Sequence, residues 1–259
     1  MSCRVLVLLP DRDFDVTEVA VPWKLLVRAG HSVVFATSDG APGAADPLLV
    51  SGVVLGQLGA KPEPLAFYRE LERAPEFTSP LAWADVDPSL SSAPSSQLDA
   101  LHLPGGHAKG MRPYLESERV QAIAAAFFAA GKPVSAICHG VLVLARAKDR
   151  ATGRPLLHGR RTTCLPSYME RTAFYATAWR RGRYYRTYDA YVQQEVEQAL
   201  GPDGSFERGP ITLFAHGTDH DDGPAFVVED GPYVSARWPG DAYLLAKRLL
   251  ARLDASDRS

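Results

Sequence analysis

The chain is poor in cysteine and nearly balanced in charge, and both features exclude classes of protein. Three cysteines occur in 259 residues, an odd and small number that does not fit a disulfide-stapled secreted domain. Lys and Arg number 28 against 30 Asp and Glu, a net charge of −2. No overall field therefore attracts nucleic acid or an anionic membrane.

Long apolar runs are also missing. No stretch reaches the roughly 18 apolar residues that a membrane helix requires. The first ten residues carry only a short apolar run before Asp11 and Asp13, unlike a secretory signal. We therefore expect a soluble, cytoplasmic protein with no membrane partner and no nucleic-acid partner.

Short apolar and β-branched runs alternate with segments of helical spacing, which is typical of βαβ units in a mostly parallel sheet. At 46 % hydrophobic residues the chain has ample material for one large core. We predict a single α/β domain spanning 1–259. The expected strands are 4–9, 31–37, 98–103, 133–137, 225–229 and 233–236, and the expected helices are 17–29, 118–130, 140–148 and 241–253.

Two stretches depart from this alternation. Residues 88–97 (PSLSSAPSSQ) are low in apolar content and predict a loop. Residues 174–191 are crowded with aromatic and arginine side chains and interrupt the sheet pattern. We expect a small insertion, a cap or lid, around 167–200.

Cys138 carries the strongest chemical signal. A buried strand ends at Ile137 and a helix opens at Gly140, which places Cys138 on a sharp strand-to-helix turn. Such an elbow exposes a nucleophile above the sheet, and the helix N-terminus favours a thiolate and a lowered pKa. A buried structural cysteine is the alternative, but position and neighbours favour a reactive one.

Two further elements belong to the same edge of the predicted sheet. Gly105 and Gly106 follow a strand, so that their backbone N–H groups, with that of His139, can bind an oxyanion. Glu18 lies near the end of the first strand. It either complements the helix dipole or stays protonated and hydrogen-bonds the thiolate.

Together, these elements resemble the ThiJ/PfpI superfamily, whose fold is that of class I glutamine amidotransferase domains. The resemblance rests on 18–22 (EVAVP), 104–107 (PGGH) and 136–140 (AICHG), in this order. The chain is most similar to the heat-shock and glyoxalase III branch. The resemblance implies a flavodoxin-like three-layer sandwich with a small helical insertion.

The resemblance also implies roles for single residues. Cys138 would be the nucleophile, His139 its base and Glu18 the carboxyl that contacts the thiol. Glu170, which follows a proline downstream, stands where that branch has its third triad member, although a solvated glutamate at a helix start is the alternative. His107 would border the oxyanion and substrate site with the two glycines.

The expected reaction is that of glyoxalase III, from a 2-oxoaldehyde to a 2-hydroxy acid, with no cofactor. A cysteine hydrolase, amidase or hydratase of the same superfamily is one alternative, and a holdase chaperone or redox sensor is another. The family resemblance further implies a homodimer.

Two other patterns contain residue types that bind metal ions or nucleic acid. His216, Asp219 and His220 have residue types that bind metal, but their Gly- and Asp-rich context predicts a loop without fixed spacing, so no metal site is expected. The arginines and tyrosines of 174–191 are basic and aromatic in alternation, as in some single-strand binders. A lid or subunit contact fits a slightly acidic protein better.

Overall fold

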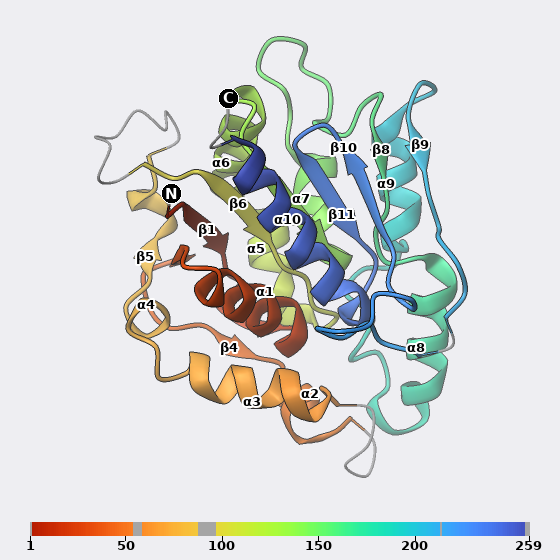
Figure 1. Ribbon diagram of the computed structural model, residues 1–259. Helices are drawn as coiled ribbons and strands as arrows, with labels where there is room; N and C mark the ends of the chain where they lie inside the picture. Colours follow the sequence, from red (N-terminus) through yellow and green to blue (C-terminus); the bar gives the residue numbers. More distant parts are fainter. Residues whose placement is uncertain (1, 54–58, 88–96, 213, 257–259) are drawn as a thin grey trace.

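The central sheet has seven strands in the order β10-β11-β7-β6-β1-β3-β5. The computed structural model describes residues 2–53, 59–87, 97–212 and 214–256 (Figure 1). Neighbouring strands of the sheet are parallel, except that β10 and β11 are antiparallel. The strands of the sheet are β1 (Arg4–Leu8), β3 (Ser32–Thr37), β5 (Leu81–Ala82), β6 (Ala100–Leu103), β7 (Val134–Ile137), β10 (Val227–Asp230) and β11 (Tyr233–Ala236).

Helices cover both faces of the sheet, which gives the expected three layers. On the face toward the viewer in Figure 1, α1 packs against α3 and α10, whereas on the far face α7 packs against α5, α6 and α9. This explains why Val5–Leu8 of β1 is apolar at every position and almost fully buried. The helices are α1 (Val16–Arg28), α2 (Pro47–Ser51), α3 (Pro62–Leu71), α4 (Pro75–Thr78), α5 (Arg112–Glu116), α6 (Glu118–Ala129), α7 (Val141–Arg146), α8 (Ser167–Arg181), α9 (Val192–Leu200) and α10 (Ala242–Ser256).

Shorter elements complete the fold. Two small parallel pairs lie outside the main sheet, β2 (Arg12–Phe14) with β4 (Ala44–Ala45) and β8 (Arg161–Thr162) with β9 (Ser205–Phe206). Single 3-10 turns occur at η1 (Trp83–Asp85), η3 (Lys109–Met111), η4 (Cys138–Gly140) and η5 (Pro239–Asp241).

The predicted alternation of strands and helices is confirmed, with one helix shorter than expected. The helix predicted over 140–148 begins as η4 and continues as α7 only to Arg146, because Ala147 leaves the helical region with ψ 141°. The predicted loop 88–97 lies, apart from Gln97, outside the described residues. In the part of the chain that the structure describes, no helix is long and apolar enough to cross a bilayer.

The strand order brings the three sequence elements together. The chain passes from β1 to β3 on one side and returns to β6 on the other, so the order reverses between β1 and β6. In open α/β sheets, ligands bind beyond the carboxyl ends of the strands at such a reversal. Glu18 follows β1, Gly105 follows β6, and Cys138 follows the adjacent β7.

Candidate active site

Cys138 occupies a strained turn directly after β7. Its φ of 57° is in the left-handed region that non-glycine residues rarely adopt. Gly140 permits this turn, since a Cβ there would lie 2.3 Å from the Leu103 carbonyl oxygen and 2.6 Å from that of Pro104. The elbow after β7 is therefore packed backbone to backbone on the turn after β6.

Gly105 serves Glu18 rather than an oxyanion, which corrects one expected role. Its N–H donates to Glu18 Oε2 at 2.8 Å, so this donor is already engaged. A Cβ at Gly105 would lie 2.8 Å from both Glu18 Oε2 and the His139 nitrogen. Gly106 is packed equally tightly, with the Asp13 carbonyl oxygen 2.3 Å from where its Cβ would lie.

The Glu-x-x-x-Pro motif has a physical explanation in α1. Pro22 has no N–H, and in a helix that N–H would bond the carbonyl of Glu18 four residues earlier. The buried His102 ring fills the vacancy, since its Nε2 lies 2.8 Å from the Glu18 carbonyl oxygen. Ser135 Oγ, 2.9 Å from His102 Nδ1, holds the ring from its other side. His102 and Ser135 were not found from the sequence, although a helical proline indicates that some donor is required.

The carboxyl of Glu18 is fully buried and only half satisfied. Asp15 caps α1 by accepting from the Thr17 and Glu18 N–H groups, and Gly105 binds Glu18 Oε2. Glu18 Oε1 has no nitrogen or oxygen partner, and a hydrogen bond with the Cys138 side chain is a minor cause that acts to lower the pKa of Glu18. Burial, and then the charge of Asp15, raise the pKa of Glu18 well above its usual value. These causes favour a protonated acid beside Cys138, which can donate a hydrogen bond to sulfur.

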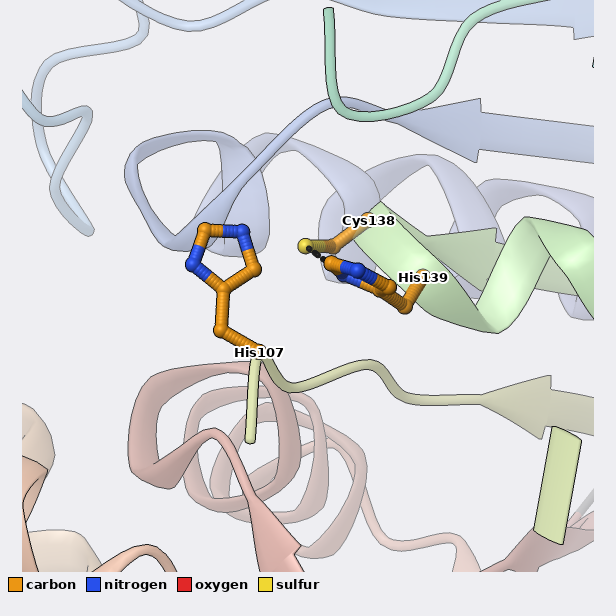
Figure 2. A group of neighbouring side chains, drawn as sticks. All are labelled: His107, Cys138 and His139. Carbon is orange, nitrogen blue, oxygen red and sulfur yellow. Dashed lines mark hydrogen bonds between the residues drawn. The ribbon is translucent and has the colours of Figure 1, made fainter. Parts of the chain in front are cut away.

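His139 presents an unprotonated nitrogen to the sulfur. Its Nδ1 lies 3.5 Å from Cys138 Sγ (Figure 2), and its Nε2 lies 3.1 Å from Thr187 Oγ1. Thr187 Oγ1 donates its only proton to the His107 carbonyl oxygen at 2.6 Å. It must then accept from His139 Nε2–H, because a carbonyl oxygen only accepts. The tautomer so fixed leaves Nδ1 free to receive the thiol proton.

The pKa of Cys138 departs from expectation. The sequence predicted a pKa lowered by the helix N-terminus, but burial, and then the charges of Glu18 and Asp15, raise the pKa of the thiol well above its usual value. The side chain is only 3 % exposed, so the cost of desolvating a thiolate exceeds the gain from the short α7. Protonation of Glu18 removes the contribution of the Glu18 charge to this raised pKa.

Glu170 is not the hydrogen-bond partner of His139, which corrects a second expectation. It is buried, and binds Arg186 at 3.3 Å through Oε1 and the Val192 N–H at 3.0 Å through Oε2. Burial is the main cause that raises the pKa of Glu170 to about 7. Thr187 instead occupies the place beside His139. Glu170 and Arg186 thus anchor the 182–191 segment that carries Thr187, and α8 and α9 flank this segment.

His107 lies across the site from the other two side chains. Its ring meets the ring of His139 edge to face, with centroids 4.8 Å apart, and Tyr185 packs on it at 5.9 Å. His107 Nε2 is buried without a hydrogen-bond partner. Burial is the largest cause that lowers the pKa of His107 to about 4, so the ring is neutral near pH 7. The sequence placed His107 at the border of the oxyanion and substrate site but did not indicate its ring contact with His139.

The loop after Phe214 does not assemble the metal ligands that were weighed from the sequence. The His216 ring packs against that of Trp238 at a tilt of 56°, with centroids 4.6 Å apart, Asp219 pairs with Arg28 at 3.4 Å, and His220 is exposed. Among the described residues, the metal-type ligands that do cluster are His107, Cys138 and His139.

The arrangement combines a nucleophile, a proton acceptor and a buried acid around one sulfur. Cys138 supplies the thiol, His139 Nδ1 accepts its proton, and Glu18 supplies a second proton-transfer group at the same carboxyl edge of the sheet. The His139 backbone N–H lowers the pKa of Cys138 through a hydrogen bond to its side chain. Such a site can add a thiolate to an electrophilic carbon and then move protons on the adduct.

Comparison with known proteins finds relatives that match most of the chain. A family described as ThiJ/PfpI family-like matches residues 9–210. A deglycase of Pyrococcus abyssi is 31 % identical over 240 residues, 93 % of each chain. An uncharacterized protein of Schizosaccharomyces pombe is 30 % identical over 252 residues, 96 % of this chain and 83 % of that protein.

Solved structures share the fold at lower identity. The crystal structure of glyoxalase III from Candida albicans has a TM-score of 0.67 and 20 % identity, and the match covers 96 % of this chain and 97 % of that one. At this identity the likeness extends to the α/β fold alone.

Proposed function

The chain belongs to the ThiJ/PfpI family, and on this premise we propose that it is a cofactor-independent enzyme whose Cys138 attacks a small 2-oxoaldehyde. The product is the corresponding 2-hydroxy acid, lactate in the case of methylglyoxal. The observation that carries the proposal is the 3.5 Å contact between Cys138 Sγ and the unprotonated Nδ1 of His139.

The first step is addition. The thiol proton passes to His139 Nδ1 while sulfur bonds to the aldehyde carbon, and protonated Glu18 gives its proton to the carbonyl oxygen, which yields a hemithioacetal and leaves Glu18 as a carboxylate. The His139 backbone N–H stabilises the oxygen as its charge develops.

The second step moves a proton between two neighbouring carbons. Glu18, now a carboxylate, takes the hydrogen of the former aldehyde carbon as a proton, and the electron pair left behind shifts onto the neighbouring carbonyl oxygen to give an enediolate. The hydroxyl proton of the first carbon moves to that oxygen and Glu18 returns its proton to the second carbon, which gives a thioester, so one carbon is oxidised while its neighbour is reduced. Water then breaks the sulfur–carbon bond, releases the hydroxy acid and restores the thiol. The pKa of Glu18, raised by burial, suits a group that must both take and return a proton.

The test is lactate formation from methylglyoxal without glutathione or added metal. Wild type and Cys164→Ala are expected to turn over alike, because Cys164 is buried and its sulfur contacts the Leu165 carbonyl oxygen. Cys138→Ser is expected to be inactive. Absence of lactate with the wild type, or its persistence with Cys138→Ser, would refute the proposal.

A deglycase activity is the second candidate, and the Pyrococcus abyssi relative favours it. Adducts of a 2-oxoaldehyde with an amine or thiol contain the same two carbons, so the same thioester would form after the adduct opens. Release of N-acetylcysteine from its methylglyoxal adduct, faster than the adduct dissociates unaided and dependent on Cys138, distinguishes this activity. If N-acetylcysteine is released no faster than the enzyme consumes free methylglyoxal, the free aldehyde is the only substrate.

A further inference from the structure

We propose that His107, Cys138 and His139 form a binding site for a thiophilic divalent cation of the zinc class, and that the bound cation blocks the nucleophile. The inference concerns metal binding alone and does not depend on which substrate the site uses. No metal site was expected here from the sequence, where His107 had been assigned to the oxyanion region.

The ligand spacing fits a single ion. One potential ligand atom from each of the three residues lies within 4.8 Å of the others (Figure 2). For tetrahedral zinc, with Zn–S of about 2.3 Å and Zn–N of about 2.05 Å, sulfur and nitrogen ligands lie about 3.6 Å apart. Cys138 Sγ and His139 Nδ1 are 3.5 Å apart. Only His107 has to approach for the third ligand to bind.

His107 supplies the independent sign that a ligand is missing. Its Nε2 is buried and has no hydrogen-bond partner, which is costly for a polar atom unless something binds it. Figure 2 shows the ring reaching across the site, with one nitrogen on the side facing the Cys138 sulfur. Tyr185 and His139 pack against the ring, so the side chain is held at the site rather than turned away.

Thr187 orients the His139 ring and is tied to the backbone of His107. Its hydroxyl accepts from His139 Nε2–H and donates to the His107 carbonyl oxygen. Metal-binding histidines commonly use their second nitrogen in this way, which fixes the tautomer and directs the lone pair of the first nitrogen at the ion. The lone pair of His139 Nδ1 is thereby directed toward Cys138.

The charge balance of binding is simple. A sulfur–metal bond forms, the thiol proton leaves to solvent, and no atom changes oxidation state. One thiolate and two neutral imidazoles leave a single net positive charge on the complex, with a fourth position for water. Nearby Asp15, and Glu18 in its carboxylate form, favour that charge, whereas Arg146 and Arg186, whose charges act on His139, oppose it.

The consequence is inhibition by occupancy. The ion uses the sulfur lone pair and the His139 nitrogen that addition to an electrophile requires, so metal and substrate exclude each other. Binding of the cation reversibly protects the Cys138 thiol from alkylation and also inhibits turnover.

The test is a titration of the full-length reduced protein with Co²⁺ in a buffer free of thiols. Wild type is expected to bind one equivalent, with the visible bands of tetrahedral cobalt and a near-ultraviolet sulfur-to-cobalt band. Cys138→Ser should lose the sulfur band, and His107→Gln should bind at least about tenfold more weakly because one direct ligand is gone. Cys164→Ala and the exposed His220→Gln are the matched controls and should titrate like wild type.

A second measurement keeps the proposal falsifiable if a variant does not fold. Zn²⁺ should slow alkylation of Cys138 by iodoacetamide in the wild-type protein, and the zinc needed should rise at least about tenfold in His107→Gln. Unchanged affinity in His107→Gln, or a sulfur-to-cobalt band that persists in Cys138→Ser, would overturn the proposal. Neither readout requires turnover, so failure here is distinct from failure of the proposed reaction.

Discussion

Cys138 and Cys164 are two buried cysteines whose sulfur atoms have different neighbours. Each follows a strand, Cys138 after β7 and Cys164 after β8, and burial is the largest cause that raises the pKa of both thiols. Cys164 Sγ lies 3.7 Å from the carbonyl oxygen of Leu165, an atom that cannot take a proton at neutral pH. Cys138 Sγ instead faces an imidazole nitrogen at 3.5 Å.

The difference shows what makes a buried thiol a nucleophile in this protein. Burial and a position after a strand do not suffice, because Cys164 has both. A backbone held at positive φ, a proton acceptor of fixed tautomer and a neighbouring carboxyl distinguish Cys138. Each of these three features can be removed separately.

The neighbouring carboxyl is expected to have the largest effect. Glu18→Gln keeps the shape and the ability to bind the Gly105 N–H but cannot transfer a proton, so kcat should fall by about 10²–10⁴-fold. The midpoint of thermal unfolding should not fall, since a buried ionisable group is replaced by a neutral one. Steady-state kinetics and calorimetry on one preparation measure both. A kcat within threefold of wild type would remove Glu18 from the reaction.

The strained elbow is the second feature to remove. Gly140→Ala places a Cβ 2.3 Å from a carbonyl oxygen, and the clash is with backbone that cannot rotate away. We expect a loss in the free energy of unfolding of about 3 kcal/mol or more, together with loss of Cys138 reactivity.

Gly131→Ala is the matched control for that substitution. Gly131 has a φ of 64° but open space around it, so alanine there should cost only about 1–2 kcal/mol. Urea unfolding of both variants decides the point, and equal losses would show that the elbow is not tightly packed on the β6 turn.

The acid beside the site predicts a pH dependence of stability. Burial is the main cause that raises the pKa of Asp15 from 3.8 to about 6 in the folded protein. Below about pH 4, Asp15 is protonated in the folded and the unfolded protein, and its contribution to the free energy of unfolding is complete. As the pH rises through 6, Asp15 ionises in the folded protein and this contribution is lost. Asp15→Asn retains a capping oxygen and should remove up to about 3 kcal/mol of this decline in unfolding free energy between pH 4 and 7. If the unfolding free energy of Asp15→Asn declines as steeply as that of wild type, Glu18 and Glu170 cause the decline instead.

The fixed tautomer of His139 is expected to have the smallest effect. Thr187→Val keeps the shape but removes the hydroxyl, so His139 is free to carry its proton on Nδ1, and kcat should fall about tenfold with little change in KM. Thr187→Ser restores the hydroxyl and should recover most of the loss. Equal rates for the valine and serine variants would show that Thr187 only fills space.

Much of the site was readable in the sequence because its motifs encode backbone contacts. Pro22 leaves the Glu18 carbonyl without its helical donor, and Gly105 and Gly140 stand where a Cβ would collide with backbone. Such requirements admit few residue types, so they leave a pattern of fixed spacing. The same holds for β1, whose continuous apolar run follows from helices on both faces.

The parts that were missed depend on distant side chains or on competing energies. Thr187 lies 48 residues after His139, in a segment rich in arginine and tyrosine where no motif marks a single hydroxyl as important. Glu170 had the right residue type, but its partner Arg186 could be placed only in three dimensions. The pKa of Cys138 depends on the balance between burial, which raises it, and the dipole of a short helix, which lowers it. The sequence does not show how deeply the thiol is buried.

The most direct test of the account is to find which sulfur the substrate modifies. Wild-type protein mixed briefly with methylglyoxal, quenched in acid and digested should carry the mass of one substrate molecule on the peptide containing Cys138. The peptide containing Cys164 should be unmodified, and Glu18→Gln should accumulate the Cys138 adduct because the proton transfer that follows addition is slowed. Equal labelling of Cys164, or turnover without any adduct at Cys138 in either protein, would contradict the central role assigned to the elbow.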